Sequence, residues 1–193
     1  RLGLPDRDYY FNTDERNASI RSEYSKHLTA MFELIAYENK IAKKNADGVL
    51  ALETTIAKSS RKMEDLRDPY KNYNKMSIAQ LNKLTPSVKW EEMIQKLGLS
   101  NVDSIIVAQP EYFTALEKTL KTVSLDNWKV YLKWSVLNRF ADYLPKKIAD
   151  QDFYFYSTVL DGVKEQKPRW KTSRDCGCRA GSSGVSQSGR HGR

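Results

Sequence analysis

Residues 13–35 read TDERNASIRSEYSKHLTAMFELI, and residues 39–58 read NKIAKKNADGVLALETTIAK. In the first stretch, apolar side chains recur at steps of three or four residues, as Ile20, Tyr24, Leu28, Met31 and Ile35. This spacing predicts an amphipathic helix with one buried face. The second stretch predicts another helix, with apolar side chains on one side at Val49, Leu52 and Ile56. We expect the two helices to be antiparallel neighbours joined by a short turn.

The residues before this hairpin predict an extended entry segment. Gly3 and Pro5 oppose a helix within residues 1–12. Asn12 is placed to cap the following helix, and Glu15, three residues later, completes a box-like pair with it.

The middle of the chain predicts an ordered loop followed by two short helices. Residues 67–76 lack a helical period and contain a proline. Ser77 and Gln80 have the spacing of a capping box and open a helix that runs to about Leu84. The next helix runs from about Trp90 to Leu97, and Gly98 stands where a C-terminal cap belongs.

The second half of the body predicts one short strand and three more helices. The β-branched run at residues 105–107 is either a strand or a buried extended linker. Pro110 suits the first turn of a helix that carries Phe113, Leu116 and Leu120. A long helix over residues 126–142 presents a row at Trp128, Leu132, Val136 and Phe140. A last helix over residues 149–160 is rich in aromatic side chains, which we interpret as core packing and not as a platform for stacking bases.

Composition supports a mainly α, multi-helical domain with little or no sheet. The 193 residues, 40% of them hydrophobic and 29% charged, suffice for one domain with a real core. No apolar run is long enough for a membrane span. Of the net charge of +8, residues 172–193 contribute +3 and the body +5. The lysines and acids of the body are interspersed along the chain, which favours a solvated surface over nucleic-acid binding. The sequence starts at Arg1 and not at a methionine, so we expect the true N-terminus to lie outside it.

The composition changes abruptly after Lys171. Residues 172–193 contain five of the nine glycines and no aromatic residue. Such a stretch cannot bury enough surface to offset its ordering entropy, so we predict a folded domain over residues 1–171 and a disordered tail over residues 172–193. Both cysteines, Cys176 and Cys178, lie in this tail and fall short of a four-ligand metal site.

No catalytic, cofactor-binding or metal-binding residue is predicted in this chain. A zinc peptidase of the His-Glu-x-x-His type needs two imidazoles one helical turn apart with a glutamate beside the first. The sequence has two histidines, His27 and His191, and neither begins that pattern. We interpret His27 as a surface or hydrogen-bonded helix residue. With one histidine in the body and no Gly-x-Ser-x-Gly turn, a nucleophilic triad has no candidate either.

Six segments in order give the chain a family resemblance. They are Leu2 to Tyr10 (LGLPDRDYY), Leu50 to Glu53, the pair of Arg67-Asp68-Pro69 with Tyr73 to Leu81, Gln109 to Phe113, Trp128 to Trp134, and Gln166 to Lys171. Together they resemble the neprilysin family of zinc metalloendopeptidases, which includes endothelin-converting enzymes and bacterial secreted relatives. The resemblance covers about residues 1–171.

The resemblance implies a non-catalytic piece of a peptidase. In that family this region belongs to the helical domain, which caps the catalytic domain and encloses a chamber that admits small peptides and excludes folded proteins. The zinc ligands and catalytic residues lie further along the family's chains, so the resemblance carries no site residue onto this sequence. It implies zinc for the parent enzyme only, the catalytic domain and peptide substrates as partners, and a secreted, periplasmic or membrane-anchored location outside the cytoplasm. We expect this chain alone to be inactive.

Two alternatives remain open at the level of sequence. The resemblance ends at Lys171, where the family would continue into another helix, so we hypothesise that the tail is a frameshift product or a misassembled gene end; a genuine flexible tail is the alternative. For the function, the alternative is a free-standing helical module that binds peptides or proteins without enzymatic activity. A nucleic-acid-binding protein ranks last, because the body has no basic stripe.

Overall fold

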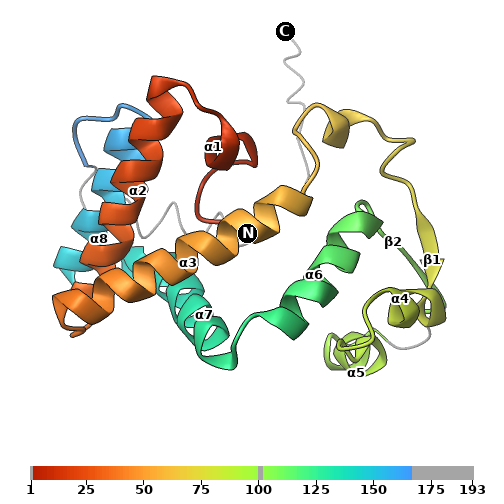
Figure 1. The fold of residues 1–193 in the computed structure, drawn as a ribbon. Helices are drawn as coiled ribbons and strands as arrows, with labels where there is room; N and C mark the ends of the chain where they lie inside the picture. The colour runs from red at the N-terminus through yellow and green to blue at the C-terminus, as the bar shows by residue number, and fades with distance from the viewer. Residues whose placement is uncertain (1, 100–101, 167–193) are drawn as a thin grey trace, which may run out of the picture. The chain divides into compact units, whose positions relative to one another are not determined.

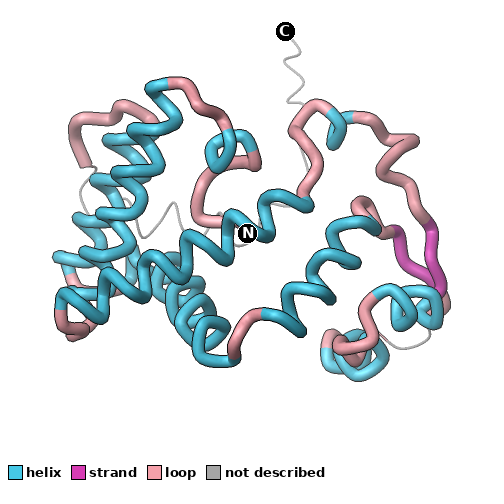
Figure 2. Tube along the Cα trace, viewed as in Figure 1, coloured by secondary structure: helices cyan, strands magenta, loops and turns pink. Residues whose placement is uncertain are grey.

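The computed structural model describes residues 2–99 and 102–166 and confirms a mainly α-helical chain (Figures 1 and 2). The predicted tail over residues 172–193 lies outside the described residues, and the boundary at residue 171 stays a prediction. The chain divides into two compact units, residues 1–139 and residues 140–193. Among the described residues, no helix has the length and apolar composition that crossing a membrane requires.

The hairpin predicted from the opening stretches is the centre of the first unit. Helices α2 (Glu15–Leu34) and α3 (Asn39–Ser59) pack against each other (Figure 1). Ala36 turns the chain between them with a φ of 70°. The predicted apolar face is buried along both helices, in α2 at Ile20, Tyr24, Leu28 and Met31. Ile35, the last residue of the predicted row, lies beyond the end of α2 and is only partly buried, whereas Phe32, which the row did not include, is buried. The period of the sequence therefore identified the core of this unit.

The segment before the hairpin differs from the prediction in two ways. It is not extended throughout, because α1 (Asp8–Phe11) forms one helical turn. The Asp6 carboxylate starts this turn by accepting the Asp8 N–H at 2.8 Å. The cap of α2 is Asp14 and not Asn12: the Asp14 side chain accepts the Asn17 N–H at 3.0 Å. Aspartate competes well for that position, and the helix starts two residues later than Asn12 would require.

The elements that follow agree closely with the sequence. Ser77 and Gln80 form the predicted capping box of α4 (Ile78–Leu84). Helix α5 (Trp90–Lys96) ends before Gly98, whose φ is 73°. Strand β1 (Lys75–Ser77) pairs antiparallel with β2 (Ser104–Ile106), so the β-branched run is a strand and not a linker. Helix α6 (Pro110–Thr122) begins with its proline and packs on α3 and α4.

Helix α7 (Leu125–Phe140) buries a different face from the row noted in the sequence. Trp134 and Leu137 are its buried residues, whereas Leu132, Val136 and Phe140 are each more than half exposed. Both rows are apolar, so the sequence alone could not tell which one this chain covers.

The second unit contains the last predicted helix in two parts. A 3₁₀ turn (Ala141–Tyr143) precedes α8 (Lys146–Phe153), which continues into a π-helix over Tyr154–Leu160. Within the aromatic run, Phe155 is buried and Tyr154 is 49% exposed. The interpretation of this run as core packing therefore holds for Phe155 and not for Tyr154.

Candidate functional site

A buried polar cluster in the first unit surrounds Glu53. This residue lies on the buried face of α3 and is 1% exposed. Its Oε1 accepts the Gly3 N–H at 3.1 Å, and its Oε2 accepts the hydroxyls of Tyr10 at 2.9 Å and Tyr24 at 2.8 Å. Tyr10 in turn accepts the Leu4 N–H at 3.1 Å. One carboxyl group thus ties the segment that precedes α2 to the middle of α3.

Burial dominates the electrostatics of this carboxyl. Removal from water raises the pKa of Glu53, because desolvation penalises the charged form. The hydrogen bonds from Tyr24, Tyr10 and Gly3 favour the charged form and oppose that rise only in part. The pKa of Tyr131 is raised to about 12, first by burial and then by the negative charge of Glu53.

The Glu53 cluster is built to hold the fold together and not to react. A general base must come within hydrogen-bond reach of a substrate proton. Glu53 is enclosed, and the donors that bind it, among them Gly3, Tyr10 and Tyr24, belong to the protein. We therefore interpret it as an anchor for the N-terminal segment, whose glycine and tyrosine are the groups that bind it.

Sequence reasoning missed Glu53, although a signal was present. The residue stands four positions after Val49 and three before Ile56, on the predicted apolar face of its helix. A carboxylate at a core position requires buried donors. Two tyrosines and a glycine amide supply them here. Gly3 and Tyr10 lie in a segment that carries the family resemblance, and Tyr24 lies in the predicted apolar row of α2.

His27, the one histidine among the predicted body residues, lies in the core of the first unit and not on its surface. His27 is 1% exposed, and its ring centroid lies 5.6 Å from that of Trp134 and 6.4 Å from that of Tyr24. Within residues 2–99 and 102–166, no group of three or more His, Cys, Asp or Glu side chains is arranged to hold a metal ion. Cys176, Cys178 and His191 lie outside the described residues.

Arg61 organises the loop between α3 and β1. Its guanidinium binds the carboxylate of Glu111 through Nε and Nη2, and its Nη1 donates to the Lys71 carbonyl and the Asn72 side chain, each at 3.0 Å. Asn72 donates to three carbonyls of the same loop, those of Asp65, Leu66 and Asp68. The loop predicted over residues 67–76 is therefore held in place by the side chains of Arg61 and Asn72, which donate hydrogen bonds to its backbone carbonyls.

This ordered loop presents aromatic side chains to solvent. Tyr70 is 91% exposed and Tyr73 is 62% exposed. Large apolar groups held in the open by a hydrogen-bonded loop are typical of a contact surface.

A second exposed apolar surface runs along α7. We call Leu125, Leu132 and Val136 the α7 stripe; they are 69%, 59% and 60% exposed. At ~100° per residue, all three lie within about 40° of one another around the helix axis. They form the one-sided row that a helix offers to a neighbour.

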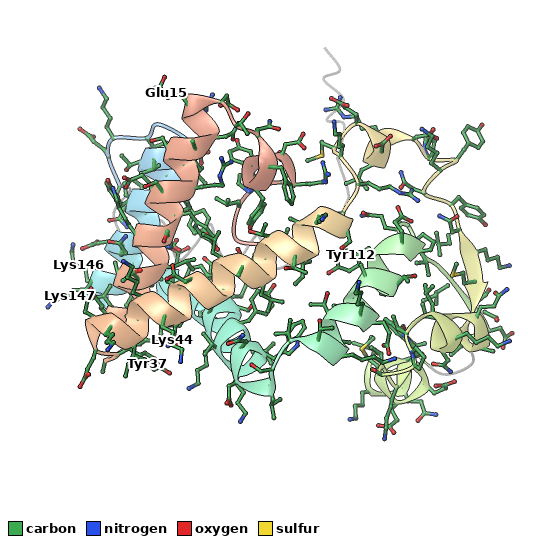
Figure 3. The ribbon with its side chains drawn as sticks, in the orientation of Figure 1. Glu15, Tyr37, Lys44, Tyr112, Lys146 and Lys147 are labelled. Carbon is green, nitrogen blue, oxygen red and sulfur yellow. The ribbon has the colours of Figure 1, made fainter. Side chains whose placement is uncertain are left out.

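A shallow polar groove lies between α2 and α3. It has a volume of about 390 Å³ and is lined by Ser22, Ser25, Lys26, Thr29, Ala30, Glu33, Asn39 and Lys43. Figure 3 shows the side chains at this end of the hairpin, where Tyr37 and Lys44 are labelled. Its lining lacks the apolar walls with a few convergent polar groups that mark ligand sites.

Comparison with known proteins relates the chain to one peptidase family. The model of peptidase family M13 matches residues 1–181. Human endothelin-converting enzyme 1 is 25% identical over 175 residues, which make up 88% of this chain and 23% of that enzyme. The endothelin-converting enzyme homolog of Locusta migratoria is 27% identical over 184 residues, covering 88% of this chain and 25% of the locust protein.

Solved structures agree with this relationship. Zinc metalloprotease 1 of Mycobacterium tuberculosis, in its open state, superimposes with a TM-score of 0.83 at 29% identity, over 90% of this chain and 27% of that one. PepO of Lactobacillus rhamnosis superimposes with a TM-score of 0.73 at 17% identity, over 93% of this chain and 28% of that one, a likeness that concerns the fold alone. The chain spans about a quarter of the length of the relatives that it matches.

Proposed function

Because the chain belongs to peptidase family M13, as part of the N-terminal region of a neprilysin-type metallopeptidase, we propose that it serves a full-length enzyme that hydrolyses peptides. The observation that carries this proposal is the agreement of sequence and fold with zinc metalloproteases over nine-tenths of the chain. The same agreement favours the peptidase over a free-standing binding module.

The zinc ion of that enzyme would be held by residues outside this chain. The described residues offer no metal-ligand group, and the two histidines of the full sequence do not form a His-Glu-x-x-His pair. When bound, zinc would polarise the scissile carbonyl and activate water. The contribution of this chain is then structural: its helices cap the catalytic domain and restrict the size of the substrates that reach it.

The exposed apolar surfaces support a role beside further protein. The α7 stripe and the side chains of Tyr70 and Tyr73 leave large groups in solvent, as surfaces that contact another part of a protein do.

We also propose that the enzyme acts outside the cytoplasm. Fractionation of cells that express it tests this location, and activity found only in the cytoplasmic fraction would contradict it.

Cleavage of two substrates of different size, a short peptide and a folded protein, tests the proposed function. The full-length enzyme should cleave a short fluorogenic peptide, lose that activity to a chelator and regain it with added zinc. The same cleavage sequence placed in a loop of a stable folded protein should resist. The 193-residue chain should cleave neither substrate. Activity that is insensitive to the chelator would refute the zinc peptidase, and equal cleavage of the folded carrier would refute the size restriction.

A further inference from the structure

Helix α7 is apolar on two opposite faces. Trp134 is 1% exposed and packs with its ring centroid 6.3 Å from that of Tyr24 and 6.4 Å from that of Phe32, both on α2. Leu125 lies nine residues before Trp134, which is about 180° around the helix at ~100° per residue. The α7 stripe therefore points away from the face that α2 covers.

A helix that is apolar on both sides normally lies between two layers. Nine of the sixteen residues of α7 are aliphatic or aromatic, whereas only Asp126, Lys129, Lys133 and Arg139 are charged. Within the described part of the first unit, only one of the two layers is present. The stripe repeats at seven and four residues and runs for about 16 Å at ~1.5 Å per residue, which is the spacing that another helix would match.

The charged residues of α7 flank the stripe and carry excess positive charge. We call them its rim: Asp126 is acidic, and Lys129, Lys133 and Arg139 are basic. Lys129 is paired with Asp126 at 3.5 Å, and Lys133 donates to the Tyr37 hydroxyl at 3.1 Å. The basic rim disfavours a second copy of this chain as the occupant, because self-pairing would bring like charges together. A partner with acidic side chains would fit it.

We propose that the α7 stripe is covered in the full-length enzyme by an amphipathic helix from the part of the protein outside this chain, with aspartate or glutamate along the edges of its apolar face. The inference rests on the proposed function, since the related metalloprotease chain is almost four times as long as the part that matches here. It goes further by naming the surface, the shape of the partner and the charge that selects it.

Cysteine labelling of the full-length enzyme tests the proposal. In a background that lacks reactive cysteines, Leu132→Cys and Val136→Cys are each treated with a maleimide in buffer and again in urea. Lys44→Cys, on the exposed part of α3 labelled in Figure 3, is the matched control. We expect both stripe variants to react at least about tenfold more slowly in buffer than in urea, and the control to react at similar rates.

The charge of the partner is tested on the same variants. Adding Lys129→Glu and Arg139→Glu should speed the labelling of Leu132→Cys in buffer, because the acidic edges of the partner would then be repelled. Adding Lys44→Glu should leave that rate unchanged. A rate that does not respond to the rim reversal would overturn the acidic partner.

The labelling rates also distinguish a helix of the full-length enzyme from a second copy of the chain as the group that covers the stripe. Equal labelling of the stripe and of Lys44→Cys in the full-length enzyme would overturn the proposal, as would protection that is equally strong in the 193-residue chain. Protection that grows with protein concentration would assign the stripe to a second copy instead. Zinc-dependent hydrolysis is measured on the same samples, so a failure of the proposed function is seen separately from a failure at the stripe.

Discussion

At the scale of single residues, the N-terminal motif acts through one carboxyl group. Gly3, Tyr10 and Tyr24 converge on Glu53 from positions up to 50 residues away. The sequence did not indicate that these three residues share a partner, because a contact over such a separation leaves no local period. The contacts of this buried carboxylate predict how substitutions at Gly3 and at Glu53 change stability.

Gly3→Ala should destabilise the protein by about 1–3 kcal/mol, the usual cost of a disrupted buried hydrogen bond. An added Cβ at Gly3 would come within 1.8 Å of the Tyr24 hydroxyl oxygen, so Tyr24 must move away from Glu53. Gly48→Ala is the matched control: its nearest foreign atom is 3.8 Å away, and alanine within α3 should stabilise by about 0.5–1 kcal/mol. Urea unfolding measures both, and equal effects would contradict the close approach.

Glu53→Gln should remove a pH dependence. The folded-state pKa of Glu53 is raised above its ordinary value of 4.5, so the wild type loses stability as pH rises from that value through the raised pKa. Glutamine cannot ionise, so the stability of the wild type relative to the variant should fall by up to ~1.4 kcal/mol per pH unit in that window and then level off. The free energy of unfolding in urea from pH 4 to pH 8 measures this difference. A constant difference would show that Glu53 keeps an ordinary pKa.

At the scale of elements, local signals predicted most of the structure. The capping box at Ser77, the proline that opens α6 and the glycine after α5 each act within one helical turn, so the sequence contains all the information they need. Where two local solutions compete, the sequence decides less: Asp14 caps α2 although Asn12 was equally suitable by type. The buried face of α7 depended on distant residues and was not predictable.

The loop between α3 and β1 should depend on Arg61 more than on its ion-pair partner. Arg61→Ala removes the donors to the Lys71 carbonyl and to Asn72, whereas Glu111→Gln leaves them in place. Hydrogen exchange at the amides of Tyr70, Lys71 and Asn72 should speed up about tenfold in Arg61→Ala and much less in Glu111→Gln. The Glu111 carboxylate is about half exposed, so global stability should change by no more than about 1 kcal/mol in Glu111→Gln. Equal exchange in the two variants would argue against the loop network.

At the scale of the whole molecule, net charge and exposed apolar side chains have opposite effects on the association of copies of the chain. The net charge of +8 makes copies of the chain repel one another, while exposed side chains such as Tyr70 and Leu125 favour association. The fold class followed from composition and period. The proposed role rests on the comparison with longer relatives, because helical periods and caps specify a fold and carry no functional motif of their own.

The 193-residue chain should therefore become less soluble as salt increases. Screening shortens the range of charge repulsion from about 10 Å at 0.1 M salt to about 3 Å at 1 M, whereas apolar attraction persists. Light scattering at rising sodium chloride concentrations should increase, and the double variant Leu132→Glu, Val136→Glu should shift the onset to higher salt. Scattering that falls with salt would indicate association driven by charge instead.

The anchor at Glu53 also sets an order of events during synthesis. Gly3 leaves the ribosome before Glu53 has been added, and at ~5–20 residues per second the interval between them lasts on the order of several seconds. During that time neither the glycine amide nor the Tyr10 hydroxyl has the Glu53 carboxylate to bind. The segment around Gly3 and Tyr10 is thus made before its partner, and it can dock in its final place only after the middle of α3 has been added.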